Sequence, residues 1–214
     1  MKSLSQVAYD GILNLILSGK YRPGYPLKED ELASELGISR TPIREALARL
    51  EREGIILKSG RSYVVIPMTK DDVIQLYEVR IPLEAEAAKL AALRASPQEI
   101  EEIMRIIDSI KKARGVDDPL ELASLNGRFH ELVVASSHNK YLEEMLRNVR
   151  TRLKIVRVTL FTGSQRKEEE VREHEEIAMS IRDRKAEEAY NKMKEHEENV
   201  LKFVKETVLP LLFS

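Results

Sequence analysis

The sequence predicts a mostly α-helical chain in two parts, three short helices with a β-hairpin followed by an antiparallel bundle of longer helices. Three short segments with helical apolar spacing come first, and a stretch that alternates like two strands follows them. From residue 69 onward the pattern is helical and the helix starts are well marked. The length of 214 residues also exceeds the usual domain of about 100–150 residues.

The first three helices are each followed by a glycine. Apolar residues recur at helical spacing over residues 4–18, and a second short helix covers residues 30–36. Ser39 is a suitable N-cap for a third helix that runs to about Glu53. We therefore expect helix, helix, tight turn and helix in this order.

The hairpin follows directly, because the run IILKSGRSYVVIP reads as two short strands joined at Ser59 and Gly60. Helix, helix, turn, helix and hairpin make a winged helix-turn-helix. We assign residues 1–67 to it, with the joint at Pro67 and Met68.

Residues 68–214 are predicted to form the all-α antiparallel bundle, because the connections between their helices are short. Three helix starts combine an N-cap with an acid three residues later: Thr69 with Asp72, Ser96 with Glu99, and Asp118 with Glu121. The expected helices lie near 70–94, 97–113, 119–136, 139–160, 165–183 and 186–208.

Composition narrows the class of protein. The chain has no cysteine, so disulfides and thiolate metal sites are excluded. No segment approaches the roughly 18 uncharged apolar residues of a membrane span, and the N-terminus does not read as a signal peptide. We expect a cytoplasmic protein without membrane contact. The net charge of −1 means that any binding of nucleic acid must depend on where the arginines lie.

The third helix carries the candidate DNA-reading residues. Its apolar residues face inward at helical spacing. Four other side chains of this helix then face solvent or a binding partner: Arg40, Thr41, Arg44 and Arg49. Such a helix suits the major groove of DNA, where arginines read guanine edges and hold phosphates. A charged helix face is, however, more often simply solvated.

The stretch DELASELGISRTPIREALARLEREGII closely resembles the helix-turn-helix of the GntR family of bacterial regulators, and the resemblance covers about residues 4–66. It is most distinctive at residues 39–47. The resemblance implies that Arg40, Thr41 and Arg44 contact operator bases and phosphates, with Ser39 beside them and Arg49 as a weaker candidate.

The same resemblance implies that the wing enters the minor groove through residues near Ser59 and Arg61. Two positions depart from the family pattern. Asp30 stands where some relatives have a DNA-contacting arginine, and the run from Arg61 to Tyr63 replaces a glycine-rich wing. The base preference of relatives is therefore not transferable.

The second domain contains all four histidines of the chain, and three of them occupy apolar helix stripes: His130, His174 and His196. Each alone is typical of a hydrogen-bonded core histidine. Imidazole is also the commonest transition-metal ligand, and Asn126 shares a helix face with His130 at a spacing of four residues. His138, before a helix start, reads as a surface residue.

Residues 71–209 resemble the FCD ligand-binding domain of the FadR branch of GntR proteins, with Arg80 and Glu84 in one matching element and Asn126 and His130 in another. The resemblance implies that an Asp and three His hold a divalent ion, often zinc, nickel or manganese, beside a cavity for a small carboxylate effector. Asn126 replaces that Asp, and a neutral amide oxygen is a weaker ligand.

An arginine could hold the other end of the carboxylate. Arg80 is the first candidate and Arg152 the second. Either could instead be a structural ion-pair partner, since Glu84 lies one helical turn after Arg80.

We expect a regulator and not an enzyme, namely a repressor that binds a palindromic double-stranded operator as a homodimer and is controlled by its effector. Two alternatives stay open. The metal could be purely structural, or the chain could be a metal-dependent hydrolase. Glu131 and Glu173 are available carboxylates for the hydrolase, but the sequence shows no hydrolase motif beside the histidines.

Overall fold

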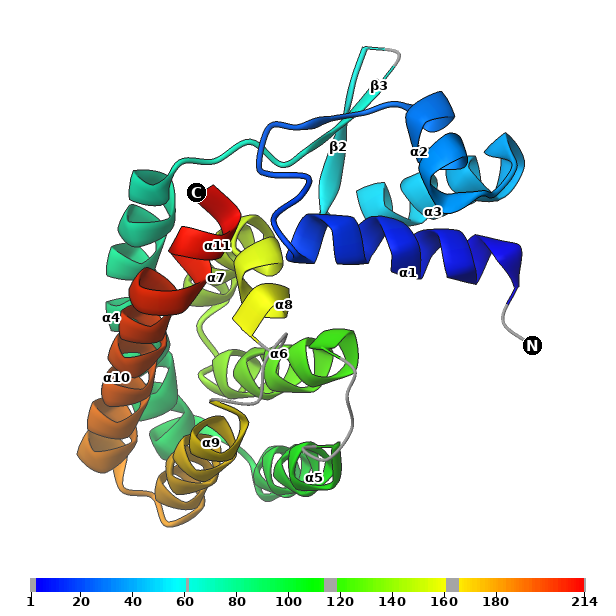
Figure 1. Cartoon of the computed structure of the whole chain (residues 1–214). Coiled ribbons are helices and arrows are strands. Elements are labelled where there is room, and N and C mark those ends of the chain that lie inside the picture. The colour runs from blue at the N-terminus through cyan, green and yellow to red at the C-terminus, as the bar shows by residue number, and fades with distance from the viewer. Residues whose placement is uncertain (1–2, 61, 114–118, 161–165, 214) are drawn as a thin grey trace. The chain divides into compact units, whose positions relative to one another are not determined.

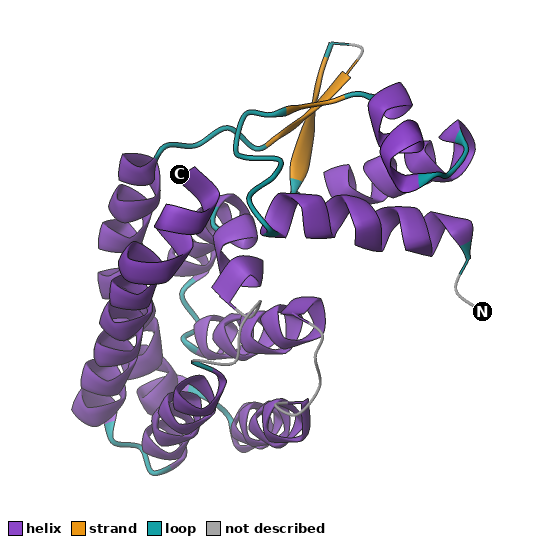
Figure 2. Cartoon of the chain, viewed as in Figure 1, coloured by secondary structure: helices purple, strands orange, loops and turns teal. Residues whose placement is uncertain are grey.

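The computed structural model describes residues 3–60, 62–113, 119–160 and 166–213 (Figures 1 and 2). The strands are β1 (Pro26–Leu27), β2 (Ile56–Ser59) and β3 (Ser62–Val65). The helices are α1 (Leu4–Leu17), α2 (Glu29–Leu36), α3 (Arg40–Arg52), α4 (Lys70–Arg94), α5 (Pro97–Ala113), α6 (Pro119–Ser136), α7 (Lys140–Arg152), α8 (Lys154–Leu160), α9 (Lys167–Arg182), α10 (Ala186–Phe203) and α11 (Leu209–Phe213). A π-helical segment, Val204–Val208, joins the last two.

The chain divides into two compact units. One contains the residues up to Val73 together with the C-terminal segment from Glu206, and the other runs from Ile74 to Lys205. The functional domain bounds of 1–67 and 68–214 stay a prediction. Each unit is described by itself below.

The N-terminal unit is a winged helix-turn-helix, as predicted. Its antiparallel sheet has the order β1-β3-β2, and the hairpin register pairs Ile56 with Val65 and Ser59 with Ser62. The sequence predicted only the two strands of the hairpin. The third strand, β1, is two residues long, which is too short to show the alternation that marks a strand in a sequence.

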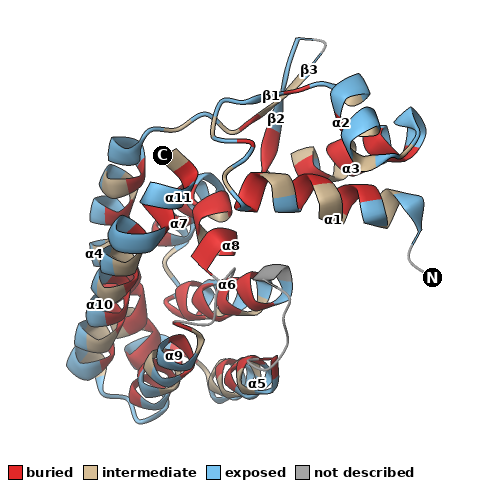
Figure 3. Cartoon of the chain, viewed as in Figure 1, coloured by how far each residue is buried: buried red, intermediate tan, exposed pale blue. Residues whose placement is uncertain are grey.

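The core of this unit lies between α1 and α3, which pack against each other. Tyr9, Ile12 and Ile16 of α1 and Ile43 and Leu47 of α3 are fully or almost fully buried. Figure 3 shows these inner faces in red and the outer faces in blue. Burying one face of α3 leaves its opposite face exposed, and that face carries the arginines.

The larger unit is an all-helical bundle, as predicted, in which α5 packs against α6 and α9, and α9 packs against α10. Its main core consists of buried apolar residues from five helices: Ala88, Ala91, Ala92, Ile103, Ile107, Ile110, Phe129, Val133, Val171, Ile177, Ala178, Ile181, Ala189 and Met193. Among the helices that the structure describes, none is both long and apolar enough to cross a membrane.

Two helix starts form reciprocal capping boxes. The main-chain N–H of Thr69 donates to Asp72 Oδ2 at 2.7 Å and the N–H of Asp72 donates back to Thr69 Oγ1 at 3.1 Å. Ser96 and Glu99 make the same exchange at 2.7 and 3.2 Å. These two starts are confirmed, whereas the predicted cap at Asp118 lies outside the described residues.

Two predicted helices end differently in the structure. The helix expected over 139–160 is broken at Leu153 into α7 and α8. The helix expected over 186–208 stays α-helical only to Phe203 and then continues through the π-helical segment into α11. The break at Leu153 has no proline or glycine beside it, so no local sequence signal marked it. The π-helical segment ends two residues before Pro210, which has no N–H and disturbs the preceding helical turn.

Candidate DNA-binding helix and buried histidine cluster

The N-terminal end of α3 presents its polar side chains to solvent. Arg40, Thr41 and Arg44 are exposed. Arg40 Nε lies 2.6 Å from a carboxylate oxygen of Asp30, and Arg44 Nε lies 2.6 Å from one of Glu29. Exposed ion pairs contribute only about 0–1 kcal/mol, so both guanidinium groups can exchange these partners for phosphates or bases at little cost.

Ser39 occupies the N-cap position of α3, but its hydroxyl makes no capping hydrogen bond within the described part of the chain. The expected side-chain cap is therefore wrong. An N-cap hydroxyl accepts from the N–H of the second or third helical residue, and the third is Pro42, which has no N–H. The first-turn N–H groups stay available to an anion, and a helix N-terminus attracts one.

The side chain of Arg49 is 42% exposed but contacts three neighbours in the N-terminal unit. Its guanidinium lies 3.8 Å from the ring centroid of Tyr9, and it donates to Gln6 Oε1 at 2.8 Å and to Glu53 Oε1 at 3.0 Å. These contacts favour a packing role for Arg49. Ser59 is exposed at the end of β2, and Arg61 lies outside the described residues.

The bundle brings three buried imidazoles together from three helices. The ring centroids of His130 and His174 are 5.1 Å apart, those of His130 and His196 are 5.4 Å apart, and those of His174 and His196 are 4.4 Å apart. The Nε2 atoms of His174 and His196 face each other at 3.1 Å. One ring nitrogen from each of the three residues lies within 4.8 Å of the others.

Burial keeps two of these imidazoles neutral. It lowers the pKa of His130 to about 3, and burial with the neighbouring imidazoles lowers the pKa of His174 well below its usual value. For His196, burial again opposes the charge, but the carboxylates of Glu170 and Glu173 outweigh it and raise the pKa. Neutral imidazoles carry the free lone pair that a metal ligand needs.

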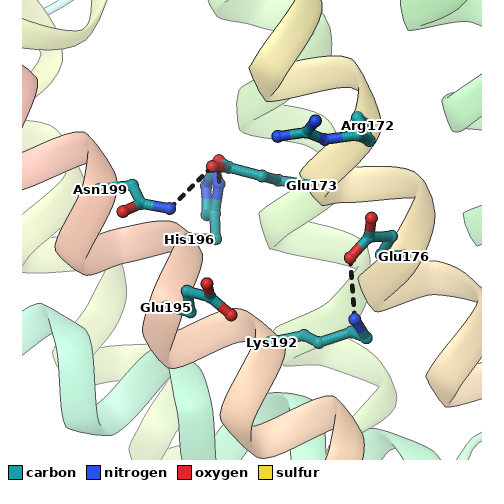
Figure 4. Close-up of a pocket in the computed structure, with 7 residues that line it drawn as sticks. All are labelled: Arg172, Glu173, Glu176, Lys192, Glu195, His196 and Asn199. Atoms are coloured by element: carbon teal, nitrogen blue, oxygen red, sulfur yellow. Dashed lines mark hydrogen bonds and ion pairs between the residues drawn. The ribbon is translucent and has the colours of Figure 1, made fainter.

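Carboxylates orient two of the rings. His130 Nδ1 lies 3.3 Å from Glu84 Oε2, and His196 Nδ1 lies 2.7 Å from Glu173 Oε2. Figure 4 shows Glu173 and His196 pointing toward each other. A carboxylate at Nδ1 holds the proton there and leaves Nε2 as the atom that can bind a metal.

Several buried polar atoms in the bundle lack a hydrogen-bond partner among the described residues, and two of them are Nδ1 of His174 and Oδ1 of Asn126. The amide nitrogen of Asn126 donates to the carbonyl of Leu122 at 2.8 Å, which leaves its oxygen free to act as a ligand. The three converging imidazole nitrogens fit a divalent transition ion, and Asn126 offers an unpartnered amide oxygen four residues before His130 on the same helix.

Arg80 lies beside this cluster but is already neutralised. Its Nη2 is 2.8 Å from Glu197 Oε1 and its Nε is 3.4 Å from Glu84 Oε1. Arg152 is exposed at the end of α7. Arg150 is buried instead, and it donates to both oxygens of Glu84 at 3.1 and 3.3 Å. Arg150 was not predicted as a site residue, although its position one turn after Leu146 on an apolar stripe marks it as inward-facing.

A pocket of about 260 Å³ opens between α9 and α10 and reaches His196 from outside. Its lining is mostly charged: Arg172, Glu173, Glu176, Lys192, Glu195, His196 and Asn199. Of the two carboxylates considered for a hydrolase, Glu173 contacts His196 here, whereas Glu131 is exposed and lies 3.7 Å from Arg128.

Two family patterns match the chain. Residues 4–65 match the gntR family of bacterial regulatory proteins, and residues 75–199 match the FCD domain. The chain is a GntR-family transcriptional regulator with an FCD domain. Because this family comprises transcriptional regulators, this regulator is not an enzyme.

Relatives of this GntR regulator agree with the assignment. It is 33% identical over 208 residues to the uncharacterized HTH-type regulator YdhC of Bacillus subtilis strain 168, covering 92% of each chain. It is 29% identical over 146 residues to the gluconate operon repressor of the same strain, covering 68% of this chain and 59% of the repressor. The structure of McbR/YncC from E. coli has the same fold, with a TM-score of 0.67, 21% identity and coverage of 97% and 100%.

Proposed function

We propose that this GntR regulator represses transcription as a homodimer on a palindromic operator, and that a small carboxylate bound beside a divalent metal ion in the FCD domain controls its operator affinity. The observation that carries this proposal is the convergence of three buried imidazoles from α6, α9 and α10. A purely apolar core would avoid this desolvation cost, because each buried polar group costs free energy unless it is paired.

His130, His174 and His196 would hold the ion, with Asn126 Oδ1 as a fourth donor. Zinc, nickel and manganese are the candidates, since imidazole nitrogen and amide oxygen can serve as ligands to all three ions. The bound ion would supply positive charge and a coordination position that a carboxylate can fill. Because Asn126 is neutral where relatives have Asp, the site would be one unit more positive and the attraction of an anion stronger.

Arg40, Thr41 and Arg44 would read the operator in the major groove while the uncapped start of α3 at Ser39 holds a phosphate. The wing would reach the minor groove with Ser59 and Arg61. Repression is supported by the similarity to the gluconate operon repressor. A homodimer would place two copies of α3 on half-sites related by a two-fold axis, which makes the operator palindromic.

The metal part of the proposal is tested with His174→Ala and, as the matched control, His138→Ala. His138 is exposed and lies 3.2 Å from Glu99, away from the cluster. We expect about one transition ion per chain in the wild type and the control, and a loss of metal and of melting temperature in His174→Ala. Equal metal content and melting temperature in all three proteins would refute the site.

A purely structural metal is the second candidate, and the neutralisation of Arg80 by Glu84 and Glu197 favours it. That arrangement leaves Arg80 no uncompensated charge for an effector. A structural ion would leave operator affinity indifferent to small acids, whereas effector control would not.

A further inference from the structure

Arg157 of α8 differs from the other arginines in the interior of the bundle. Arg80, Arg150 and Arg166 each contact a glutamate. Within the described ranges Arg157 has no carboxylate partner, and its Nη2 donates to the main-chain carbonyl of Ala123 at 3.0 Å. A guanidinium has five N–H donors, so most of its donors are uncommitted.

The guanidinium of Arg157 lies directly against α6 at Gly127. A Cβ at this glycine would be 3.2 Å from Arg157 Cζ and would collide with Nη2. Gly127 follows Asn126 directly and precedes His130 by three residues. Since positions three and four apart share a helix face, Arg157 is held on the segment of α6 that carries two of the proposed metal ligands.

Two other buried arginines act electrostatically on Arg157. Burial, followed by the charges of Arg80 and Arg150, lowers the pKa of Arg157 to about 10. The group therefore stays protonated near neutral pH, and among the described residues it contacts a main-chain carbonyl and no carboxylate.

Tyr77 of α4 provides a second unused donor, and the Arg80 guanidinium lies 5.6 Å from its ring centroid. Tyr77 is fully buried, its hydroxyl has no hydrogen-bond partner in the described structure, and the charges of Arg80 and Arg157 both act on it. Arg157 itself remains partly exposed, so a solute can reach it. A guanidinium without a carboxylate partner and a hydroxyl without an acceptor are both groups that can donate hydrogen bonds to an oxyanion.

We infer that Arg157 binds the anionic end of the effector, a small carboxylate or similar oxyanion, in place of Arg80 and Arg152. This inference rests on the proposed control of operator binding by a carboxylate. Arg80 then acts as a structural ion-pair residue that holds Glu84 and Glu197 in place.

The test uses the full-length, zinc-loaded protein with malonate and sulfate as oxyanion probes and malonamide as the uncharged counterpart. The variants are Arg157→Gln and its control Arg152→Gln, which removes an exposed arginine five residues away. We expect both anions, but not malonamide, to raise the melting temperature of the wild type. Arg157→Gln should weaken malonate binding about tenfold or more, since charged hydrogen bonds are lost, and Arg152→Gln should not.

Melting without any probe separates recognition from a structural role. Arg157→Gln removes an unbalanced cation, so we expect it to melt at the wild-type temperature or above, whereas a structural arginine would lower it. Gly127→Ala is an independent variant. Its added methyl takes the place of the guanidinium, so malonate binding should weaken even though alanine favours the helix.

Absence of a melting shift in the wild type with either anion, or equal malonate affinity in Arg157→Gln and wild type, would overturn the inference. Operator titrations keep this result distinct from the proposed function. Malonate binding that depends on Arg157 but leaves operator affinity unchanged supports the anion site and shows that malonate does not control operator binding. Malonate that releases operator equally from wild type and Arg157→Gln supports effector control and refutes the role of Arg157.

Discussion

The charged side chains of this regulator fall into two groups that differ in burial. Arg40 and Arg44 have side chains that are each 64% exposed, whereas the side chains of Arg80 and Glu84 are 3% and 0% exposed. Breaking a buried pair costs about 3–5 kcal/mol, and breaking an exposed one costs little. Exposed arginines can therefore exchange partners, and buried ones fix the shape of the bundle.

Arg44→Ala tests the exposed group. We expect specific operator binding to weaken by about 1–3 kcal/mol, which is the loss of a bidentate base contact, with an unchanged melting temperature. Arg52→Ala is the matched control, because Arg52 is exposed at the other end of the same helix. The measurement is an anisotropy titration with labelled operator selected from random DNA. Wild-type affinity in Arg44→Ala would rule out its role in reading DNA.

Substitutions of Glu173 test whether this carboxylate orients His196. Glu173→Leu should lower zinc affinity about 10–100-fold, the usual effect of losing a carboxylate that orients a ligating imidazole. Glu173→Gln keeps an acceptor for Nδ1–H and should lose less. Glu176→Leu, one turn along α9 and paired with Lys192 at 2.8 Å, serves as control. Zinc affinity is measured by competition with a chelator. Equal zinc affinities in the wild type and in all three variants would show that Glu173 does not position His196.

At the scale of elements, the start of α5 depends on the charge of Glu99. The N–H of Ser96, its main partner, holds the pKa of Glu99 below the usual 4.5. A carboxyl with a lowered folded-state pKa stabilises the fold above pH 4.5, and this contribution disappears as the pH falls through the lowered value.

We therefore expect Glu99→Gln to reduce unfolding free energy by about 0.3–1 kcal/mol at pH 7, with the deficit shrinking toward pH 3. Urea unfolding at several pH values measures it. Glu102→Gln, which alters an exposed residue of the same helix, should show no such trend. A deficit that is constant with pH would mean that the charge of Glu99 does not matter.

Elements with a strong local signal could be predicted from sequence. The reciprocal caps at Thr69 and Ser96 satisfy helix N–H groups within four residues, so their effect is local. The short strand β1, in contrast, depends on a partner that is distant in sequence. β1 exists only because β3 lies beside it, and a single sequence does not reveal such pairing.

The same distinction holds for the candidate site. Apolar helix stripes predicted that three histidines face inward, and the structure brings them together. Which arginine stays unpaired could not be predicted, because it follows from contacts between different helices. Arg80 contacts Glu84 from four residues away and Arg150 contacts it from 66 residues away, while Arg157 donates to the backbone of α6.

For the whole molecule, the central proposal is that anion binding in the FCD domain and DNA binding by α3 affect each other. If an effector weakens operator binding, operator must weaken effector binding by the same factor. Such coupling typically amounts to about 5–150-fold in affinity.

The most direct test is an operator titration of zinc-loaded wild type and of His174→Ala, each with and without the small carboxylate that stabilises the wild type most. We expect the carboxylate to change wild-type operator affinity at least about fivefold and to leave His174→Ala unchanged. An operator affinity that no carboxylate alters, or that shifts equally in His174→Ala, would contradict control through the histidine cluster.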